Sequence, residues 1–222
     1  MTSIIGKFRG LFGSASIVDP GLPLGQIPFV VVDTELTGLD PKRDSVVSLG
    51  AVKMSGTRIE LGQTLYRLVS PQSRFNRESI VVHGITPDDV VEKPPFDSVV
   101  GELLAFCGDR VLAGHFLSID LGFLTREAAA VRAAEWRRRA VDTMRIQVWM
   151  EQYRHRFGDG VTMPEGDLNL LALAGKSGIP VKGAHNALTD AYITAQLLQR
   201  QLRALPGLGV RTLGDLLRIG RP

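Results

Sequence analysis

The segment FVVVDTELTG, residues Phe29 to Gly38, decides the fold class of this chain. Its first four residues are apolar, aromatic or β-branched, and they follow Pro28, which predicts a buried central strand. Side chains two residues apart in a strand point to the same face, so Asp33 and Glu35 leave the strand on one side. Two neighbouring carboxylates at an apolar strand end repel each other, and a bound cation often explains such a pair. Taken alone, the pair is equally compatible with two surface acids.

The composition is that of a globular protein. The chain has 222 residues and 44% apolar side chains, which is enough for one large domain. The formal charge is +3 and the sequence pI is about 9.2, so a polyanionic partner is permitted but not demanded. Cys107 is the single cysteine, which excludes an internal disulfide framework. The sequence has neither the roughly 20 apolar residues of a membrane span nor a signal-peptide core, and we expect a cytoplasmic protein.

Strand and helix patterns alternate along the chain. Two apolar-rich runs, residues 45–54 and 58–69, are joined by Ser55-Gly56-Thr57, which predicts a β-hairpin and an antiparallel part of the sheet. Brief strands are expected at residues 110–113 and 140–142. Helices are expected over residues 76–83, 96–107, 120–134, 143–153, 167–173 and 184–202. This order predicts an α/β fold with a mixed sheet.

The two ends of the chain differ from its middle. Residues 3–17 have apolar side chains at roughly helical spacing, which is compatible with an amphipathic helix that contacts a membrane or a partner, although we favour a helix packed on its own domain or a frayed tail. Residues 19–28 contain three prolines and two glycines, which predicts a linker. Residues 205–217, LPGLGVRTLGDLL, resemble half of a helix-hairpin-helix, although we favour a terminal helix packed on the sheet over DNA binding. We expect an extension and linker over residues 1–28, a main domain over 29–203 and a helical tail over 204–222.

Two later segments carry acids at the starts of expected helices. AGHFLSIDLGFL, residues 113–124, places Asp120 in a first helical turn, where the helix dipole favours a carboxylate. AHNALTDAYITAQLL, residues 184–198, places His185 and Asp190 five positions apart near the start of the last helix. Taken singly, the two acids are ordinary helix acids and the histidine is an ordinary solvated or capping residue. Their significance comes from the order in which they follow the first acidic pair.

That order resembles the DEDDh family of 3′–5′ exonucleases, which includes the proofreading subunit of bacterial replicative DNA polymerases. DTELTGL at residues 33–39 is similar to the first motif of that family, HFLSIDLGFL at 115–124 to the second, and HNALTDA at 185–191 to the third. The resemblance covers about residues 29–202. It implies an RNase H-like fold, with a mixed five-stranded sheet flanked by helices. It also implies a metal-dependent exonuclease domain over residues 29–203 that releases nucleoside monophosphates.

The resemblance assigns roles to the acids and to the histidine. It implies two Mg²⁺ or Mn²⁺ ions as cofactors, bound by Asp33, Glu35, Asp120 and Asp190. A set of oxygen ligands suits these ions rather than zinc, and two ions can stabilise the attacking and leaving oxygens of a phosphodiester. His185 is expected to act as the general base toward the attacking water. These five residues are the expected catalytic residues.

Residues around the first motif are expected to contact the substrate: Thr34, Leu36, Thr37 and His83. The backbone of residues 34–37 is expected to hold the terminal 3′-OH, and Leu36 to stack on or wedge beneath the last base. His83 is equally compatible with a helix-end histidine. The sequence departs from the family pattern at Leu36, Phe116 and Ile119, where Thr, Asn and Phe are usual. These departures leave the carboxylates intact and bear on substrate preference.

We expect nucleic acid with a free 3′ end as the substrate, and single-stranded DNA rather than RNA. An RNA-trimming or oligoribonucleotide exoribonuclease of the same family is the alternative. A non-catalytic nucleic-acid-binding module is the alternative from another class, and the carboxylates disfavour it because they would repel phosphate. A DNA polymerase or repair partner is compatible with the sequence, although the short segment after Leu202 favours a free-standing nuclease. The sequence does not indicate an oligomeric state.

Overall fold

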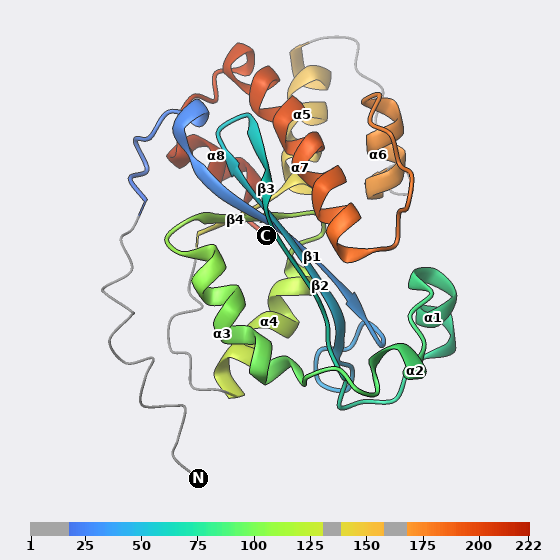
Figure 1. The fold of residues 1–222 in the computed structure, drawn as a ribbon. Helices are drawn as coiled ribbons and strands as arrows, with labels where there is room; N and C mark the ends of the chain where they lie inside the picture. The colour runs from blue at the N-terminus through green and yellow to red at the C-terminus, as the bar shows by residue number, and fades with distance from the viewer. Residues whose placement is uncertain (1–17, 131–138, 158–167) are drawn as a thin grey trace.

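A five-stranded sheet forms the centre of the protein (Figure 1), with the strand order β3-β2-β1-β4-β5. The computed structural model describes residues 18–130, 139–157 and 168–222, so the helix expected over residues 3–17 lies outside the described residues. β1 pairs antiparallel with β2 and parallel with β4, which confirms the predicted mixed sheet. The strands are β1 (Pro28–Leu36), β2 (Val46–Ser55), β3 (Arg58–Leu68), β4 (Val111–Gly114) and β5 (Ala140–Asp142).

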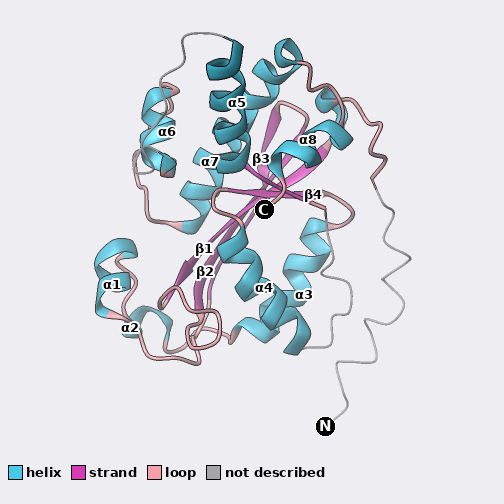
Figure 2. Ribbon diagram, turned by 180° about the vertical axis from the view of Figure 1, so that it is seen from behind, coloured by secondary structure: helices cyan, strands magenta, loops and turns pink. Residues whose placement is uncertain are grey.

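Helices cover both faces of this sheet, as Figures 1 and 2 show from opposite sides. α3 and α4 cover one face, whereas α5, α7 and α8 cover the other. None of the described helices combines the length and apolar character that crossing a membrane requires. The helices are α1 (Arg77–His83), α2 (Pro87–Val90), α3 (Phe96–Cys107), α4 (Ser118–Ala130), α5 (Thr143–Phe157), α6 (Leu170–Lys176), α7 (Ala187–Ala204) and α8 (Leu213–Gly220), with 3-10 turns η2 (Leu24–Gln26) and η4 (Leu205–Leu208).

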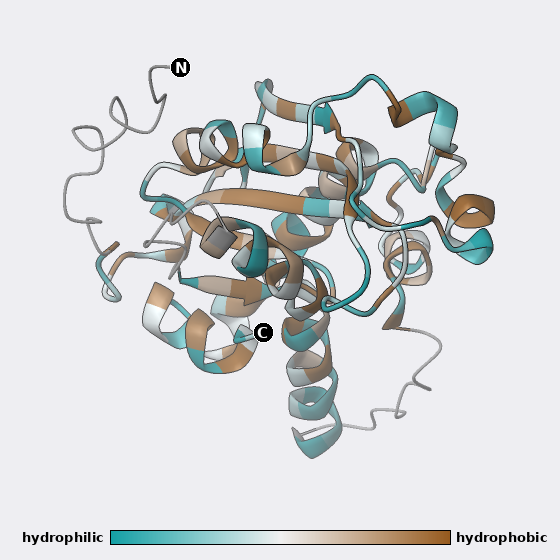
Figure 3. Ribbon diagram, turned by 90° about the horizontal axis from the view of Figure 1, so that it is seen from below, coloured by the Kyte–Doolittle hydropathy of each residue, from teal (hydrophilic) through white to brown (hydrophobic). Residues whose placement is uncertain are grey.

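β1 is buried on both faces, which explains its unbroken apolar run. Val30 and Val32 pack in the cluster under α3 and α4, whereas Phe29 and Val31 pack in the cluster under α5, α7 and α8. Figure 3 shows hydrophobic residues along the central strands of the sheet. The strand continues to Leu36, because its ladder with β2 extends that far. The acidic pair therefore lies within β1 rather than beyond its end, and the alternation directs both acids to the α7 side.

The expected helix limits needed correction at two places where an asparagine caps the helix. The Asn169 side chain accepts a hydrogen bond from the N–H of Ala172, and α6 runs from Leu170 to Lys176 rather than over residues 167–173. Asn186 caps α7 in the same way, so this helix begins at Ala187 rather than at residue 184. In both cases the cap satisfies N–H groups that a longer helix would leave to other partners.

The expectation of a linker over residues 19–28 is wrong, because this segment packs against the C-terminal end of the chain. Leu24 N–H donates to the carbonyl of Arg211, and Leu213 N–H donates to the carbonyl of Leu22. Leu24 and Ile27 are buried. Prolines and glycines shape the turns of this segment, but its burial depends on tertiary contacts that local composition does not reveal.

α8 is packed on the domain, as predicted for the terminal helix. Leu213 and Leu216 are fully buried in the cluster that also contains α5 and α7. The N–H groups of Arg211 and Thr212 donate to the carboxylate of Asp215, which forms a capping box at the start of α8. These hydrogen bonds hold the pKa of Asp215 at about 2. The carboxylate of Asp215 thus satisfies the N–H groups of Arg211 and Thr212, which precede α8.

We predict that truncating the buried face of α8 destabilises the whole domain. Leu216→Ala should lower the free energy of unfolding by about 2–5 kcal/mol, because it leaves a cavity in a fully packed cluster. Leu61→Ala is the matched control, since Leu61 is 67% exposed, and its effect should stay within about 0.5 kcal/mol. Urea denaturation followed by circular dichroism measures both values. Equal, small effects in the two variants would show that α8 is not part of the folded core.

Candidate active site

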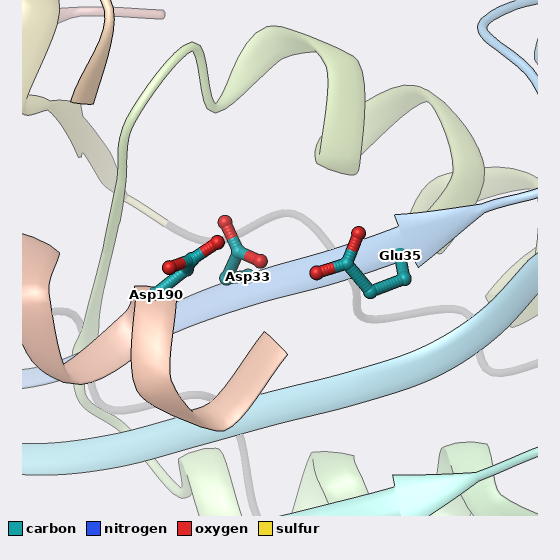
Figure 4. A group of neighbouring side chains, drawn as sticks. All are labelled: Asp33, Glu35 and Asp190. Carbon is teal, nitrogen blue, oxygen red and sulfur yellow. The ribbon is translucent and has the colours of Figure 1, made fainter. Parts of the chain in front are cut away.

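Three carboxylates from two elements meet at one edge of the sheet (Figure 4). Asp33 and Glu35 come from β1 and Asp190 comes from the first turn of α7, and one oxygen of each lies within 4.8 Å of the others. The edge is the carboxyl end of the parallel strands β1, β4 and β5, where loops and helix starts converge in sheets of this kind. The structure thus brings together three of the four acids expected at the site.

The two carboxylate oxygens of Asp190, in the first turn of α7, differ in their hydrogen bonding. Oδ2 accepts a hydrogen bond of 3.0 Å from the backbone N–H of His185. Oδ1 is buried and has no hydrogen-bond partner among the described residues. A buried carboxylate oxygen without a donor is costly unless a cation or a proton is available to it. Oδ1 is therefore the atom of Asp190 that is available for a metal ion.

His185 precedes α7 and has an unusual backbone. Its φ of 66° lies in the left-handed region, which non-glycine residues adopt rarely and at a cost of about 1 kcal/mol or more. Its side chain is exposed. The backbone N–H of His185 donates to Oδ2 of Asp190, which places this residue beside that carboxylate. Backbone strain at an exposed histidine beside an acidic cluster is typical of functional sites.

Asp120 reaches the same region from the other face of the sheet. It lies in the first turn of α4, and its Oδ1 accepts a hydrogen bond of 2.6 Å from the hydroxyl of Thr34. Asp120 is not a member of the carboxylate group that Asp33, Glu35 and Asp190 form in the described part of the chain. Its charge nevertheless contributes to raising the pKa of Asp33 and of Glu35. Asp120 therefore lies beside the cluster, held by Thr34, whose side chain contacts this acid rather than open solvent.

Burial raises the pKa values of all four acids. Desolvation is the largest cause at each of them, and neighbouring carboxylates add to it at Asp33 and Glu35. The pKa of Glu35 rises to about 8 and that of Asp120 to about 7. Asp33 and Asp190 are shifted in the same direction. At neutral pH the cluster therefore holds protons unless a cation compensates its charge.

The residues at this site fit a hard divalent cation. Their ligand atoms are carboxylate oxygens, which suit Mg²⁺, Mn²⁺ or Ca²⁺ better than softer metals. Two buried oxygen atoms here lack partners among the described residues, namely Asp190 Oδ1 and Ser48 Oγ. Ser48 pairs with Glu35 across the ladder of β1 and β2, so both side chains face the same side. A cation with its water ligands would satisfy both the repelling carboxylates and these atoms.

His83 links the end of α1 to the end of β1. Its Nε2–H donates to the carbonyl of Leu36 at 3.3 Å, and its Nδ1 accepts from the N–H of Ile85 at 3.0 Å. This pair of contacts requires the neutral ring. Burial lowers the pKa of His83, and the charge of His185 lowers it further. The structure thus places His83 near His185 but engages both of its ring nitrogens within the protein.

Leu36 and Thr37, which we expected to contact substrate, face inward. Leu36 is only 8% exposed and packs in the cluster under α3 and α4. Thr37 is fully buried, its hydroxyl contacts Ser73 at 2.7 Å, and its N–H donates to the carbonyl of Ser45. The side chains of Leu36 and Thr37 are therefore held by the protein itself. The apolar side chain that this loop does expose is Leu39, which is 74% exposed.

The sequence interpretation assigned no role to two residues that shape the site, Asp142 and His115. Asp142 is buried at the end of β5 and accepts hydrogen bonds from the N–H groups of Phe116, Leu117 and Met144. These bonds hold the turn between β4 and α4, where Phe116 has a φ of 53°. His115 is also buried, and its Nε2–H donates to the carbonyl of Leu168 at 2.8 Å. An acid directly between a short strand and a helix was the signal for Asp142.

Comparison with known proteins identifies similar sequences over most of the chain. Residues 30–198 match the model of the RNase_T family, which is described as exonuclease. A PolC-type DNA polymerase III from Thermotoga maritima is 29% identical over 192 residues, which cover 86% of this chain and 13% of that protein. The DNA polymerase III subunit epsilon of Aquifex aeolicus is 28% identical over 177 residues, which cover 80% of this chain and 81% of that protein. This chain thus spans a small part of its PolC-type relatives.

Solved structures share the fold. Escherichia coli exonuclease I in complex with a dT13 oligonucleotide has a TM-score of 0.69 and 19% identity, over 83% of this chain and 44% of that chain. Exonuclease X in complex with 5′ overhanging duplex DNA has a TM-score of 0.64 and 22% identity, over 86% of this chain and 98% of that chain. The predicted fold class, an RNase H-like mixed sheet of five strands flanked by helices, is confirmed.

We predict that the metal-free protein loses stability as the pH rises from about 5 to about 8. The pKa of Glu35 is about 8 in the folded protein and 4.5 as its ordinary value. In this range the unfolded chain releases a proton that the folded chain retains, so the free energy of unfolding falls with pH. Each unit of pKa difference corresponds to at most about 1.4 kcal/mol. Urea denaturation in a chelating buffer at several pH values measures the slope.

Glu35→Gln is the variant that isolates this effect, because it removes the titrating group with little change in volume. It should show a shallower slope than the unaltered protein and higher stability near pH 8. Saturating Mn²⁺ should also flatten the slope of the unaltered protein, since the cation compensates the ionised carboxylates. Identical slopes for the two proteins in chelator would mean that Glu35 is ionised in the folded state at neutral pH.

Proposed function

We propose that this chain, which belongs to the exonuclease family matched by its residues 30–198, hydrolyses phosphodiester bonds at the 3′ ends of nucleic acids and releases nucleoside monophosphates. The observation that carries this proposal is the meeting of Asp33, Glu35 and Asp190 beside the exposed His185. These residues come from two segments that lie more than 140 positions apart in the sequence. A binding module has no need of such a group, because carboxylates repel phosphate.

The three carboxylates are proposed to hold two Mg²⁺ or Mn²⁺ ions together with Asp120. Bound divalent ions of this kind supply charge stabilisation to the attacking and leaving oxygens of a phosphodiester. Asp33 and Asp190 come from β1 and α7, so they would hold a metal ion between the strand and the helix. Asp120 contributes from the α4 side, either directly or through a water molecule. The hydroxyl of Thr34 donates to Oδ1 of Asp120 and so fixes the position of this carboxylate.

His185 is proposed to accept the proton of the attacking water. Its imidazole is exposed at the rim of the acidic group, and its backbone N–H holds Asp190. The neighbouring carboxylates stabilise the imidazolium that forms when the proton arrives. General-base catalysis by a positioned side chain typically contributes about 10²- to 10⁴-fold to the rate.

DNA is the proposed substrate class, and a single-stranded 3′ end is the proposed form. The two similar solved structures contain an oligonucleotide dT13 and a duplex with a 5′ overhang, respectively. The exposed Leu39 at the loop after β1 is proposed to contact the terminal base, in place of the buried Leu36. Apolar side chains stack on bases in single-strand grooves without selecting a sequence. The backbone near Thr34 and the ring of His83 are proposed to border the same end.

We predict that removing any one of three side chains abolishes exonuclease activity. Asp33→Asn, Asp190→Asn and His185→Ala should each reduce the release of labelled mononucleotides from a 3′-labelled single strand in Mn²⁺, His185→Ala by about 10²- to 10⁴-fold. Asp109→Asn, at an exposed turn, is the control and should retain full activity. A 3′-phosphorylated or 3′-blocked strand should resist cleavage. Undiminished activity of all three variants would refute the proposed site.

Comparison of matched substrates tests the substrate class with the same protein. Single-stranded DNA, duplex DNA with recessed 3′ ends and RNA of equal sequence are incubated at equal concentration, and kcat/KM is measured for each. The proposal expects the highest value for single-stranded DNA. A higher value for RNA would favour the exoribonuclease alternative and leave the proposed chemistry of the site unchanged.

A DNA polymerase is the proposed partner, because both relatives described above carry polymerase III names. We expect that gel filtration of this chain with the replicative polymerase of the same organism yields a joint peak. An exonuclease family member that acts alone would elute separately, with its activity on single-stranded DNA retained.

A further inference from the structure

A row of three residues crosses the sheet beneath the start of α7. Gly50 of β2 pairs with Asp33 of β1 on one side and with Tyr66 of β3 on the other. Residues paired in register across antiparallel strands point to the same face. The face that carries Asp33 therefore continues through a bare glycine to a tyrosine at the edge strand, and α7 covers this face.

The first turn of α7 rests directly on the glycine in this row. A Cβ atom at Gly50 would lie 2.2 Å from the carbonyl atoms of Ala187 and 2.3 Å from the nitrogen of Leu188. No side chain fits there unless the helix moves away from the sheet. Asp190 follows Ala187 by three residues, so the approach of this turn to β2 sets the separation of Asp190 from Asp33.

Tyr66 and Asn186 form a hydrogen bond that ties the same turn to β3. Asn186 Nδ2 donates to the Tyr66 hydroxyl at 3.2 Å. The other end of the Asn186 amide accepts from the N–H groups of Leu188 and Thr189, so it is also the cap of α7. Asn186 thus connects the edge strand to the helix start, and it stands next to the strained His185.

We propose that Tyr66 is a positioning residue that acts through Asn186 to hold Asp190 and His185 against the β1 carboxylates. The expected effect on catalysis rests on the proposed function, whereas the expected effect on metal binding rests on the structure. The three carboxylates lie within 4.8 Å of one another, so in their ionised forms they repel, and this repulsion would push the start of α7 away from β1. The hydrogen bond between Tyr66 and Asn186 opposes that movement, because Asn186 is both the cap of α7 and the neighbour of His185.

Two conservative substitutions test the proposal. Tyr66→Phe removes one hydroxyl and keeps the ring, whereas Asn186→Ser keeps a capping oxygen and removes the reach to Tyr66. Each should weaken Mn²⁺ binding to the substrate-free protein by about 2- to 12-fold, the range expected for one hydrogen bond. Each should lower kcat on single-stranded DNA by a similar factor with little change in KM. Isothermal titration calorimetry measures Mn²⁺ binding without reference to activity.

The double variant distinguishes the proposed route from an independent effect. The two side chains act through one hydrogen bond. The double variant, Tyr66→Phe with Asn186→Ser, should therefore lose no more Mn²⁺ affinity than the single variant that binds Mn²⁺ less tightly. Tyr192→Phe, which removes a hydroxyl from α7 itself, is the control and should bind Mn²⁺ as the unaltered protein does. Gly50→Ala should lose far more affinity, and Gly62→Ala none, since a Cβ at Gly62 meets no atom within 4 Å.

The outcomes separate this inference from the proposed function. Unchanged Mn²⁺ isotherms for both single variants in an active nuclease would overturn the role of Tyr66 and leave the function standing. Additive losses in the double variant would likewise overturn it, because Tyr66 would then act by another route. Weakened Mn²⁺ binding in both single variants, without nuclease activity in the unaltered protein, would support the positioning role and refute the proposed function.

Discussion

Repulsion among the carboxylates of Asp33, Glu35 and Asp190 is the constraint on which this structure depends. An oxygen of each lies within 4.8 Å of the others, and burial makes their ionised forms costlier still. No local interaction among the three offsets this cost. The acids remain together because β1 is held on both sides, by β2 and by β4, and because the start of α7 is fixed against the sheet. The stability of the fold maintains a site that is unfavourable until charge is compensated.

The sheet distributes the parts of the site between its two faces. Alternation along β1 directs Asp33 and Glu35 toward α7, whereas Thr34 turns toward α4 and holds Asp120. The parallel strands β1, β4 and β5 end at the same edge, so a helix that follows one of them starts beside the acids. Asp142 stabilises this arrangement, because it binds the N–H groups of the turn that leads into α4. Asp142, which has no proposed chemical role, thus fixes the start of the helix that carries Asp120.

Much of the fold follows from local patterns, and the differences have identifiable physical causes. The helix over residues 96–107 coincides with α3, and the hairpin of β2 and β3 was predicted from its apolar runs and turn. The burial of residues 19–28 was not predictable, because it depends on contacts with α8 that lie far away in sequence. The four acids and His185 were assigned by motif order, but the partner of Asp120 and the inward orientation of Leu36 depend on which face each residue occupies. Register across strands decides such orientations.

The start of α7 shows why helix limits matter for chemistry. Had the helix begun at residue 184, His185 would have been a helical residue and its N–H would have pointed along the axis. Because Asn186 caps the helix instead, His185 adopts a positive φ and its N–H turns back to Oδ2 of Asp190. That bond leaves Oδ1 without a partner among the described residues. The Asn186 cap therefore determines which oxygen of Asp190 remains available to a cation and where the imidazole of His185 lies. The carboxylate of Asp190 and this imidazole cannot be displaced independently.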